Sequence, residues 1–233
     1  MVELTTELAA RWPDVSSVLN RQPWNGLTAH LLKAGVDPDA SIARLRRYCE
    51  LALQWNRKVS NLISKNDEHR IVQRHIAESL EPAHWLKECG ANRWLDFGSG
   101  AGLPAIPLAI AGIGGEWTLV ESRRTKTLFL RRALDELGIG NVTVINARLE
   151  DLLGSSELLS SYDGFTSRAT QTLVPTLAIA ANFVRSRGTA FLWKGSRREE
   201  EMSMDESWRQ NWDFDGLLAI GDGTPAVARF RRK

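Results

Sequence analysis

The stretch "LDFGSGAGLP", residues 95–104, decides the fold of this chain. It places an acidic residue before three glycines at alternate positions: Asp96, then Gly98, Gly100 and Gly102. An apolar run precedes this stretch and a helical pattern follows it. A strand that turns through glycines into a helix brings backbone N–H groups and the helix dipole to a ligand at the carboxyl end of a sheet. We therefore predict a nucleotide-binding loop.

Apolar runs typical of strands alternate with helical patterns on both sides of this loop. The predicted strands are 93–97, 117–121, 141–146, 162–167 and 188–194. The predicted helices between them are 103–111, 125–138 and 172–184. Two further runs, 213–220 and 226–232, predict a closing hairpin. This order predicts an α/β fold with a mainly parallel sheet and a C-terminal antiparallel hairpin.

The first ninety residues read as a helical extension. Apolar residues at helical spacing predict a helix over 41–59, with a stripe of Ile42, Leu45, Cys49, Ala52 and Val59. A second helix is expected to open at Asn66 or Asp67, with Val72, Ile76 and Leu80 buried. We expect residues 1–90 to pack on a core formed by residues 91–233, and the two parts to form one compact domain.

Composition excludes several classes of protein. The net charge of +2 arises from 30 basic and 28 acidic residues, so attraction to nucleic acid must come from local clusters. The first residues of the chain include acidic side chains where a secretory signal would be basic, and no stretch is apolar enough for a membrane span. These features favour a cytoplasmic protein. We also expect a monomer. Cys49 and Cys89 lack metal-ligand spacing and are interpreted as core residues, and no histidine pattern suggests a metal.

The spacing of the glycines is GxGxG, whereas a dinucleotide fingerprint reads GxGxxG, so pyrophosphate is not the expected ligand. Glu121 ends the strand that follows, where a carboxylate can accept hydrogen bonds from both hydroxyls of a ribose. Together the loop and Glu121 favour an adenosine cofactor. The alternative is that the glycines only make a tight turn and that Asp96 caps a helix.

Further segments narrow this interpretation. They are "NLISKNDEHRIVQRHIAESL" (61–80), "ESRRTKTLFLRR" (121–132), "RLED" (148–151), "YDGFTSRA" (162–169) and "WKG" (193–195). With the glycine loop, which resembles the S-adenosylmethionine site of class I methyltransferases, they are similar in order and spacing to the bacterial 16S rRNA guanine-N7 methyltransferase family (RsmG, formerly GidB). The resemblance covers about residues 41–195. Three positions depart from the family pattern: Ile63, Ala105 and Thr127.

The resemblance implies a Rossmann-like fold and S-adenosylmethionine as cofactor. It places cofactor contacts at Gly98, Leu103, Leu149, Glu150 and Arg168. With the residues already singled out, the expected cofactor site is Asp96, Gly98, Gly100, Gly102, Leu103, Glu121, Leu149, Glu150 and Arg168. For Glu150 the alternative is that it begins a helix as an acidic complement to the dipole.

The implied reaction is methyl transfer to guanine N7 in small-subunit rRNA. This nitrogen has a lone pair and no proton, so alignment with the sulfonium methyl is needed and a general base is not. Arg168, Asn61 and His75 are the expected positioning residues. Asn61 can instead cap a turn, and His75 can be a packed histidine. The lack of an NPPY-like stretch and the positions of the cysteines disfavour transfer to adenine N6 or cytosine C5.

The expected partner is small-subunit rRNA or a ribosomal particle. Arg123, Arg124 and Lys126 crowd the start of a helix, where cations are slightly unfavourable and a polyanion would offset the cost. With Lys194 they form the expected RNA-binding set. A solvated basic face is the alternative for the arginine cluster, and a snorkelling side chain is the alternative for Lys194. The tryptophans Trp94, Trp117 and Trp193 are predicted to be core.

The sequence also allows three other functions. The nearest is a methyltransferase for another RNA site or for a small molecule, which would not yield 7-methylguanosine. A NAD(P)-binding oxidoreductase would need a hydride-acceptor site, and none is recognisable. An inactive RNA-binding module is the third, and intact Asp96, glycines and Glu121 count against it.

Overall fold

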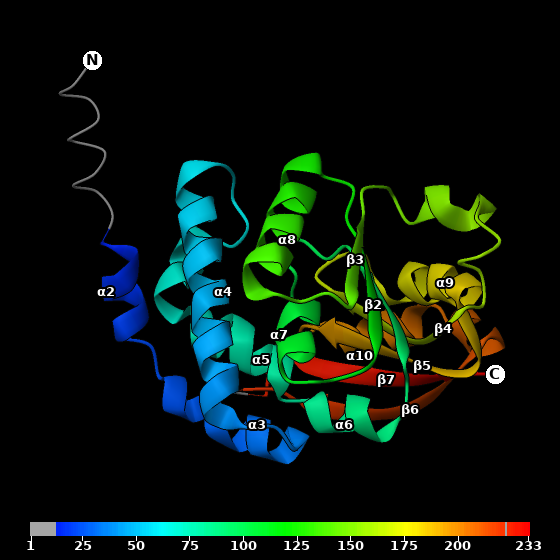
Figure 1. Cartoon of the computed structure of the whole chain (residues 1–233). Coiled ribbons are helices and arrows are strands. Elements are labelled where there is room, and N and C mark those ends of the chain that lie inside the picture. Colours follow the sequence, from blue (N-terminus) through cyan, green and yellow to red (C-terminus); the bar gives the residue numbers. More distant parts are fainter. Residues whose placement is uncertain (1–12, 222) are drawn as a thin grey trace.

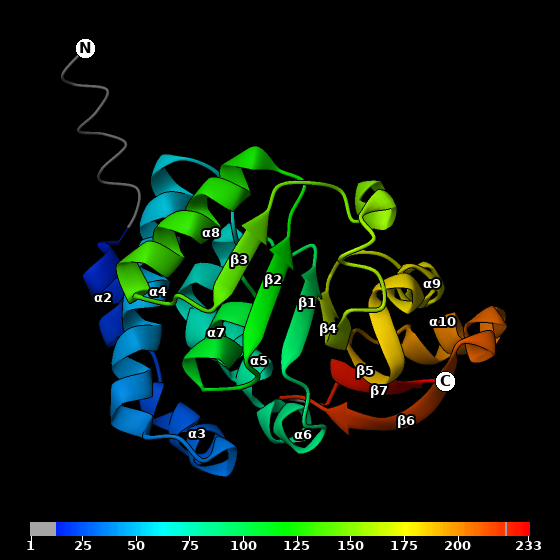
Figure 2. The same cartoon turned by 45° about the vertical axis from the view of Figure 1, so that its right-hand side comes forward.

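A computed structural model of the chain describes residues 13–221 and 223–233. Its centre is a seven-stranded sheet with the order β3-β2-β1-β4-β5-β7-β6 (Figures 1 and 2). Strands β1 to β5 run parallel, and β7 lies antiparallel between β5 and β6. The strands are β1 (Arg93–Phe97), β2 (Glu116–Val120), β3 (Val142–Ile145), β4 (Tyr162–Arg168), β5 (Val184–Lys194), β6 (Trp212–Ala219) and β7 (Ala226–Arg232). The predicted fold class, with its closing hairpin, is confirmed.

Helices cover both faces of the sheet (Figure 2). They are α4 (Pro38–Lys58), α7 (Ala105–Ile110) and α8 (Arg124–Leu137) on one face, and α9 (Leu173–Phe183) with α10 (Arg198–Met204) on the other. Side chains of β1 alternate between the two cores because neighbouring residues of a strand point to opposite faces. Trp94 packs with the α4 and α8 side, whereas Leu95 and Phe97 pack with the α9 side.

The residues before β1 form a succession of helices. Besides α4 they are α2 (Val15–Asn20), a 3-10 helix (Trp24–Leu27), α3 (Thr28–Ala34), a 3-10 helix (Lys65–Arg70), a π-helix (Val72–Ala77), α5 (Glu78–Leu80) and α6 (Ala83–Glu88). The second predicted helix thus begins at Lys65, earlier than expected. The reason is Ser64, whose hydroxyl accepts a hydrogen bond from the Asn66 amide at 3.3 Å and caps the first turn.

The predicted buried stripes are largely confirmed. Leu45, Cys49 and Ala52 on α4 are buried, and so are the three apolar residues of the second stripe: Val72, Ile76 and Leu80. The prediction for Val59 is wrong, because α4 ends at Lys58 and the Val59 side chain is left 56% exposed. Cys89 is only partly buried, at the edge of the core.

The three strand tryptophans lie in the core, as predicted. Trp94 and Trp117 stack with ring centroids 5.1 Å apart, and Trp193 is 6% exposed. In the described part of the chain, no helix has the length and apolar character to cross a bilayer. Nor do any three His, Cys, Asp or Glu side chains within residues 13–221 and 223–233 come together as a metal site.

Candidate active site

The glycine loop leaves β1 beside β4, where the order of the strands reverses along the sheet. This is the position at which open α/β sheets bind ligands. Gly98 and Gly102 have φ angles of +68° and +89°, a conformation that disfavours residues with a Cβ. A Cβ on Gly98 would also lie 2.3 Å from Cγ2 of Thr170. The loop is held from α4 as well, since the Tyr48 hydroxyl donates to the Ala101 carbonyl at 2.6 Å.

Glu121 joins this loop to the start of α8. Its side chain is 6% exposed, and its two oxygens accept hydrogen bonds from the amides of Gly100 at 2.9 Å and Arg123 at 2.8 Å. A carboxylate has about four acceptor positions, so both oxygens retain capacity for ribose hydroxyls. The predicted carboxylate therefore lies against the glycine loop and keeps a free edge.

A cavity of about 260 Å³ opens beside Glu121, at the carboxyl ends of β1, β2 and β3. Phe97, Gly98, Leu149 and Glu150 contribute to its lining. Leu149 is fully buried in the α9-side core, so it forms the floor of the cavity. Glu150 is exposed at the start of a 3-10 helix (Glu150–Gly154), and its carboxylate accepts from Gln171 at 3.2 Å. For Glu150 the structure is thus compatible with both the cofactor role and the helix-start role.

A second cavity of about 240 Å³ shares Gly98 with the first and lies on the other side of the glycine loop. The loop after α4 supplies Leu62, Ile63 and Ser64 to its wall, and the remaining lining residues include His75, Leu103, Lys126 and Arg168. Residues from the helical extension and from the sheet therefore form one wall. We call this second cavity the mouth.

Arg168 is fastened to the extension. Its guanidinium forms an ion pair with Glu78 at 2.7 Å and donates to the backbone carbonyls of Arg74 at 2.9 Å and His75 at 3.4 Å. The same group lies 3.4 Å from the Ser79 hydroxyl, and burial lowers the pKa of Arg168. Glu78 is not among the residues predicted from the sequence, because its place in the helical segment gives no signal of a partner 90 residues away.

His75 faces the mouth with an unengaged ring. Its side chain is 13% exposed, and neither ring nitrogen has a hydrogen-bond partner among the described residues. Burial, followed by the positive charge of Arg168, lowers the pKa of His75 to about 4. The Nε2 atom lies 3.8 Å from a carboxylate oxygen of Asp67. At neutral pH the ring is therefore neutral, with one donor and one acceptor.

Asn61 is exposed on the loop after α4 and is absent from the linings of both cavities. The capping role considered for it belongs to Asn56. The Asn56 side-chain oxygen accepts from the amides of Leu62 at 2.6 Å and Ile63 at 3.1 Å, and its nitrogen donates to Glu68 at 2.7 Å. Asn56 lies within the helix pattern, so the sequence offered no sign of this role.

Asp96 lies beneath the loop, 1% exposed. One carboxyl oxygen accepts from the Thr166 hydroxyl on β4 at 2.6 Å, and the other has no partner in the described part of the chain. Burial raises the pKa of Asp96 to about 7. The alternative that its side chain caps a helix is wrong, because its hydroxyl partner stands on the neighbouring strand. Its contact with a cofactor stays a prediction.

The four basic residues expected to bind RNA have different surroundings. Arg123 and Arg124 are exposed at the start of α8, and Lys126 lines the mouth. Lys194 is 10% exposed and donates to the Gln171 carbonyl at 2.8 Å and to Glu201 at 3.0 Å. Since its ammonium is engaged inside the protein, we leave Lys194 out of the RNA surface proposed below.

Three features define the class of protein as a Rossmann-like methyltransferase. They are a parallel sheet that ends in an antiparallel hairpin, a loop of glycines with positive φ angles, and a carboxylate at the end of β2. Residues 41–214 match the family model GidB, described as rRNA small subunit methyltransferase G, and the chain belongs to this family. The chain is 38% identical over 212 residues to the ribosomal RNA small subunit methyltransferase G of Sorangium cellulosum, covering 89% of this chain and 87% of the relative. It is 37% identical over 202 residues to that of Xanthomonas campestris, covering 86% and 87%.

Solved structures agree on the fold. A SAM dependent methyltransferase from Aquifex aeolicus superposes with a TM-score of 0.55 at 14% identity, covering 72% of this chain and 96% of that chain. A putative RNA methyltransferase from Pyrococcus horikoshii gives a TM-score of 0.51 at 17% identity, covering 66% and 83%. These structures support the fold alone. The predicted family, enzyme class and cofactor are confirmed by the family match and the relatives.

Proposed function

We propose that this protein transfers a methyl group from S-adenosylmethionine to N7 of a guanine in small-subunit rRNA. One observation carries the proposal: two cavities meet at the glycine loop of a chain that belongs to the rRNA small subunit methyltransferase G family. The first cavity suits the adenosine part of the cofactor. The mouth, on the other side of Gly98, suits its methionine part and the incoming guanine.

The residues present fit the cofactor. The left-handed backbone at Gly98 allows close approach, and the free edge of the Glu121 carboxylate can accept from the ribose. We propose as cofactor contacts Asp96, Gly98, Gly100, Gly102, Leu103, Glu121, Leu149, Glu150 and Arg168. When bound, S-adenosylmethionine supplies an electrophilic methyl group. Leu149 at the floor of the first cavity excludes water from the side where the base would lie.

The protein's chemical task is alignment. Guanine N7 offers a lone pair without a proton, so no side chain has to remove one, and holding two groups in line can supply roughly 7–11 kcal/mol of the barrier. His75 lines the mouth and is neutral because its pKa is about 4, so its ring carries one donor and one acceptor, both buried and without partners among the described residues. Arg168 keeps the segment that carries His75 against β4. Asn61, exposed on the neighbouring loop, remains a candidate for contact with RNA outside the cavity.

Substrate contact is proposed at the start of α8. Arg123 and Arg124 are exposed there and Lys126 reaches the mouth, so an RNA strand entering the mouth would place phosphates against cations. We propose that the substrate is 16S rRNA, alone or in a ribosomal particle, and that the enzyme acts as a cytoplasmic monomer. The family supports the location, since bacterial small subunits are assembled in the cytoplasm.

We also propose that the helical extension and the sheet form one compact domain. Three contacts support it: Tyr48 holds the glycine loop, Glu78 holds Arg168, and the Trp193 indole donates to the Glu78 carbonyl at 2.9 Å. Each joins a residue before Gly90 to a residue after it.

The function is tested with undermodified small subunits and methyl-labelled S-adenosylmethionine. After digestion to nucleosides, the label should be found in 7-methylguanosine. Glu121→Ala, which removes the proposed ribose acceptor, serves as the control with weakened cofactor binding. Label in another nucleoside, or none with any small-subunit preparation, would contradict the proposal.

A further inference from the structure

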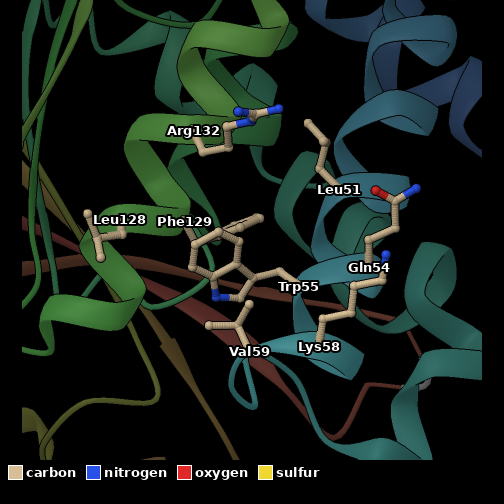
Figure 3. Close-up of a pocket in the computed structure, with 8 residues that line it drawn as sticks. All are labelled: Leu51, Gln54, Trp55, Lys58, Val59, Leu128, Phe129 and Arg132. Atoms are coloured by element: carbon tan, nitrogen blue, oxygen red, sulfur yellow. The ribbon is translucent and has the colours of Figure 1, made fainter. Parts of the chain in front are cut away.

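An apolar slot lies between the C-terminal half of α4 and the middle of α8 (Figure 3). It has a cavity volume of about 440 Å³, larger than either cavity at the glycine loop. Its apolar wall consists of Leu51, Trp55, Val59, Leu128 and Phe129. The Val59 and Leu128 side chains are 56% and 46% exposed, so the slot opens to solvent along one side. An open cavity of this volume with apolar and aromatic walls has the form that ligand sites commonly take.

The slot is aromatic at its base. The rings of Trp55 and Phe129 contact each other with centroids 5.7 Å apart at an angle of 57°. The indole nitrogen of Trp55 is buried and has no hydrogen-bond partner among the described residues. A ligand in the slot would therefore contact the ring of Trp55 and not this nitrogen, which is closed off from solvent.

Cations stand at both ends of the slot, and none of its lining residues is acidic. At one end Arg132 pairs with Glu136, which Arg47 also contacts at 3.0 Å, so charge there is balanced. At the other end stands Lys58, for which no ion pair occurs within the described residues. The unbalanced positive charge is therefore at the Lys58 end.

The Lys58 end is also the end nearest the mouth. Val59 in the slot precedes Leu62 in the mouth by three residues, which span at most about 11 Å. On α8, Lys126 in the mouth precedes Phe129 in the slot by three residues, a rise of about 4.5 Å along the helix. The slot thus continues the surface on which the methylated guanine would be presented.

We propose that the slot binds a second nucleobase of the RNA substrate, unstacked from its neighbours and close in the strand to the methylated guanine, with its phosphate at Lys58. The inference rests on the proposed function. Specific RNA recognition commonly places splayed-out bases against aromatic side chains, and a flat aromatic ligand suits a slot floored by Trp55 and Phe129. An apolar protein segment would fill the slot equally well, but it would gain nothing from the unpaired Lys58 or from continuity with the mouth.

The test compares two exposed leucines. Leu128→Glu places a carboxylate at the opening of the slot, whereas Leu32→Glu places one on α3, at the other end of α4 (Figure 1). Both side chains are exposed, so both variants should fold. Loss of one base stack should weaken RNA binding by Leu128→Glu roughly 5- to 150-fold relative to the unsubstituted protein, whereas RNA binding by Leu32→Glu should not change. The affinity for S-adenosylmethionine should be unchanged in both variants. Leu128→Gln, which adds no charge, should show the same effect in smaller degree.

A crosslink identifies the occupant. A benzophenone amino acid at position 128 should, on irradiation with undermodified small subunits, attach to rRNA close to the methylated guanine. Two outcomes would overturn the slot inference: attachment to a ribosomal protein, or equal RNA affinities for Leu128→Glu and Leu32→Glu. If the unsubstituted protein still forms 7-methylguanosine, the proposed function stands. A parent that forms no 7-methylguanosine overturns the proposed function and the slot inference together.

Discussion

The ion pair between Arg168 and Glu78 offers the sharpest test of how the extension is joined to the sheet. Arg168→Met keeps an unbranched apolar side chain similar to the aliphatic part of arginine and removes the guanidinium. The hydrogen bonds to Glu78 and to the carbonyls of Arg74 and His75 are then lost. Glu78, 7% exposed, then keeps a buried carboxylate with one cation fewer.

The cost follows from burial. Breaking a buried pair by removing one partner destabilises a protein by about 3–5 kcal/mol. The other carboxylate oxygen of Glu78 still forms an ion pair with Arg74 at 2.7 Å, and the Arg74 side chain is 43% exposed. We therefore expect the lower end of the range, about 3 kcal/mol in the free energy of unfolding. Arg168→Lys, which can keep the ion pair but not the several carbonyl bonds, should fall between the parent and Arg168→Met.

The assay is urea unfolding of four proteins: the parent, Arg168→Met, Glu78→Gln and the double variant. Because the two side chains contact each other, their coupling energy should be about 1–3 kcal/mol. A single transition is expected, since the extension and the sheet are proposed to unfold together. In methylation, Arg168→Met should lower turnover more than RNA affinity, because the wall of the mouth that carries His75 loses its anchor.

Two results would refute this reasoning. A free energy of unfolding for Arg168→Met within about 0.5 kcal/mol of the parent would show that the pair contributes little, as at an ordinary surface site. Two separate unfolding transitions in the parent would contradict the single compact domain.

Three further predictions concern the site. Glu121→Ala should weaken S-adenosylmethionine binding by about 1.5–3 kcal/mol, measured by calorimetry, since hydrogen bonds to a carboxylate are lost; equal affinity would remove the ribose assignment. Burial raises the pKa of Asp96 from 3.8 to about 7, so the folded protein holds a proton that the unfolded chain releases across this window. Stability contributed by this group is present below pH 3.8 and is lost as pH rises through 7, by up to about 4 kcal/mol. Urea unfolding at pH 5 and pH 8 should show this loss in the parent and not in Asp96→Asn; parallel changes in the two proteins would contradict it. Arg124→Gln should reduce the slope of log RNA affinity against log salt by about 0.7–0.9 while cofactor affinity holds, and an unchanged slope would exclude a phosphate contact there.

The sequence by itself determined the strands of the sheet, the helices that connect β1 to β5 and the position of the glycine loop. Strand and helix periods from residue 93 onward depend on local burial, and the sheet is buried on both faces, so the apolar runs were unambiguous. Gly98 and Gly102 need left-handed backbone that only glycine adopts readily, and Glu121 follows its strand directly. These are signals carried by neighbouring residues.

Only the tertiary structure decided what the charged and polar side chains do. In the sequence, Arg168 and Lys194 are simply cations at the ends of strands. The structure shows that each has an acidic partner inside the protein. Asn56 and not Asn61 caps the loop after α4. The slot between α4 and α8 has no signature in either helix alone. Arg168 and Glu78 are 90 residues apart, whereas Asn56 and Leu62 are only 6 apart. In each case the partners belong to different elements, so their contact depends on how the elements pack, which no local pattern encodes.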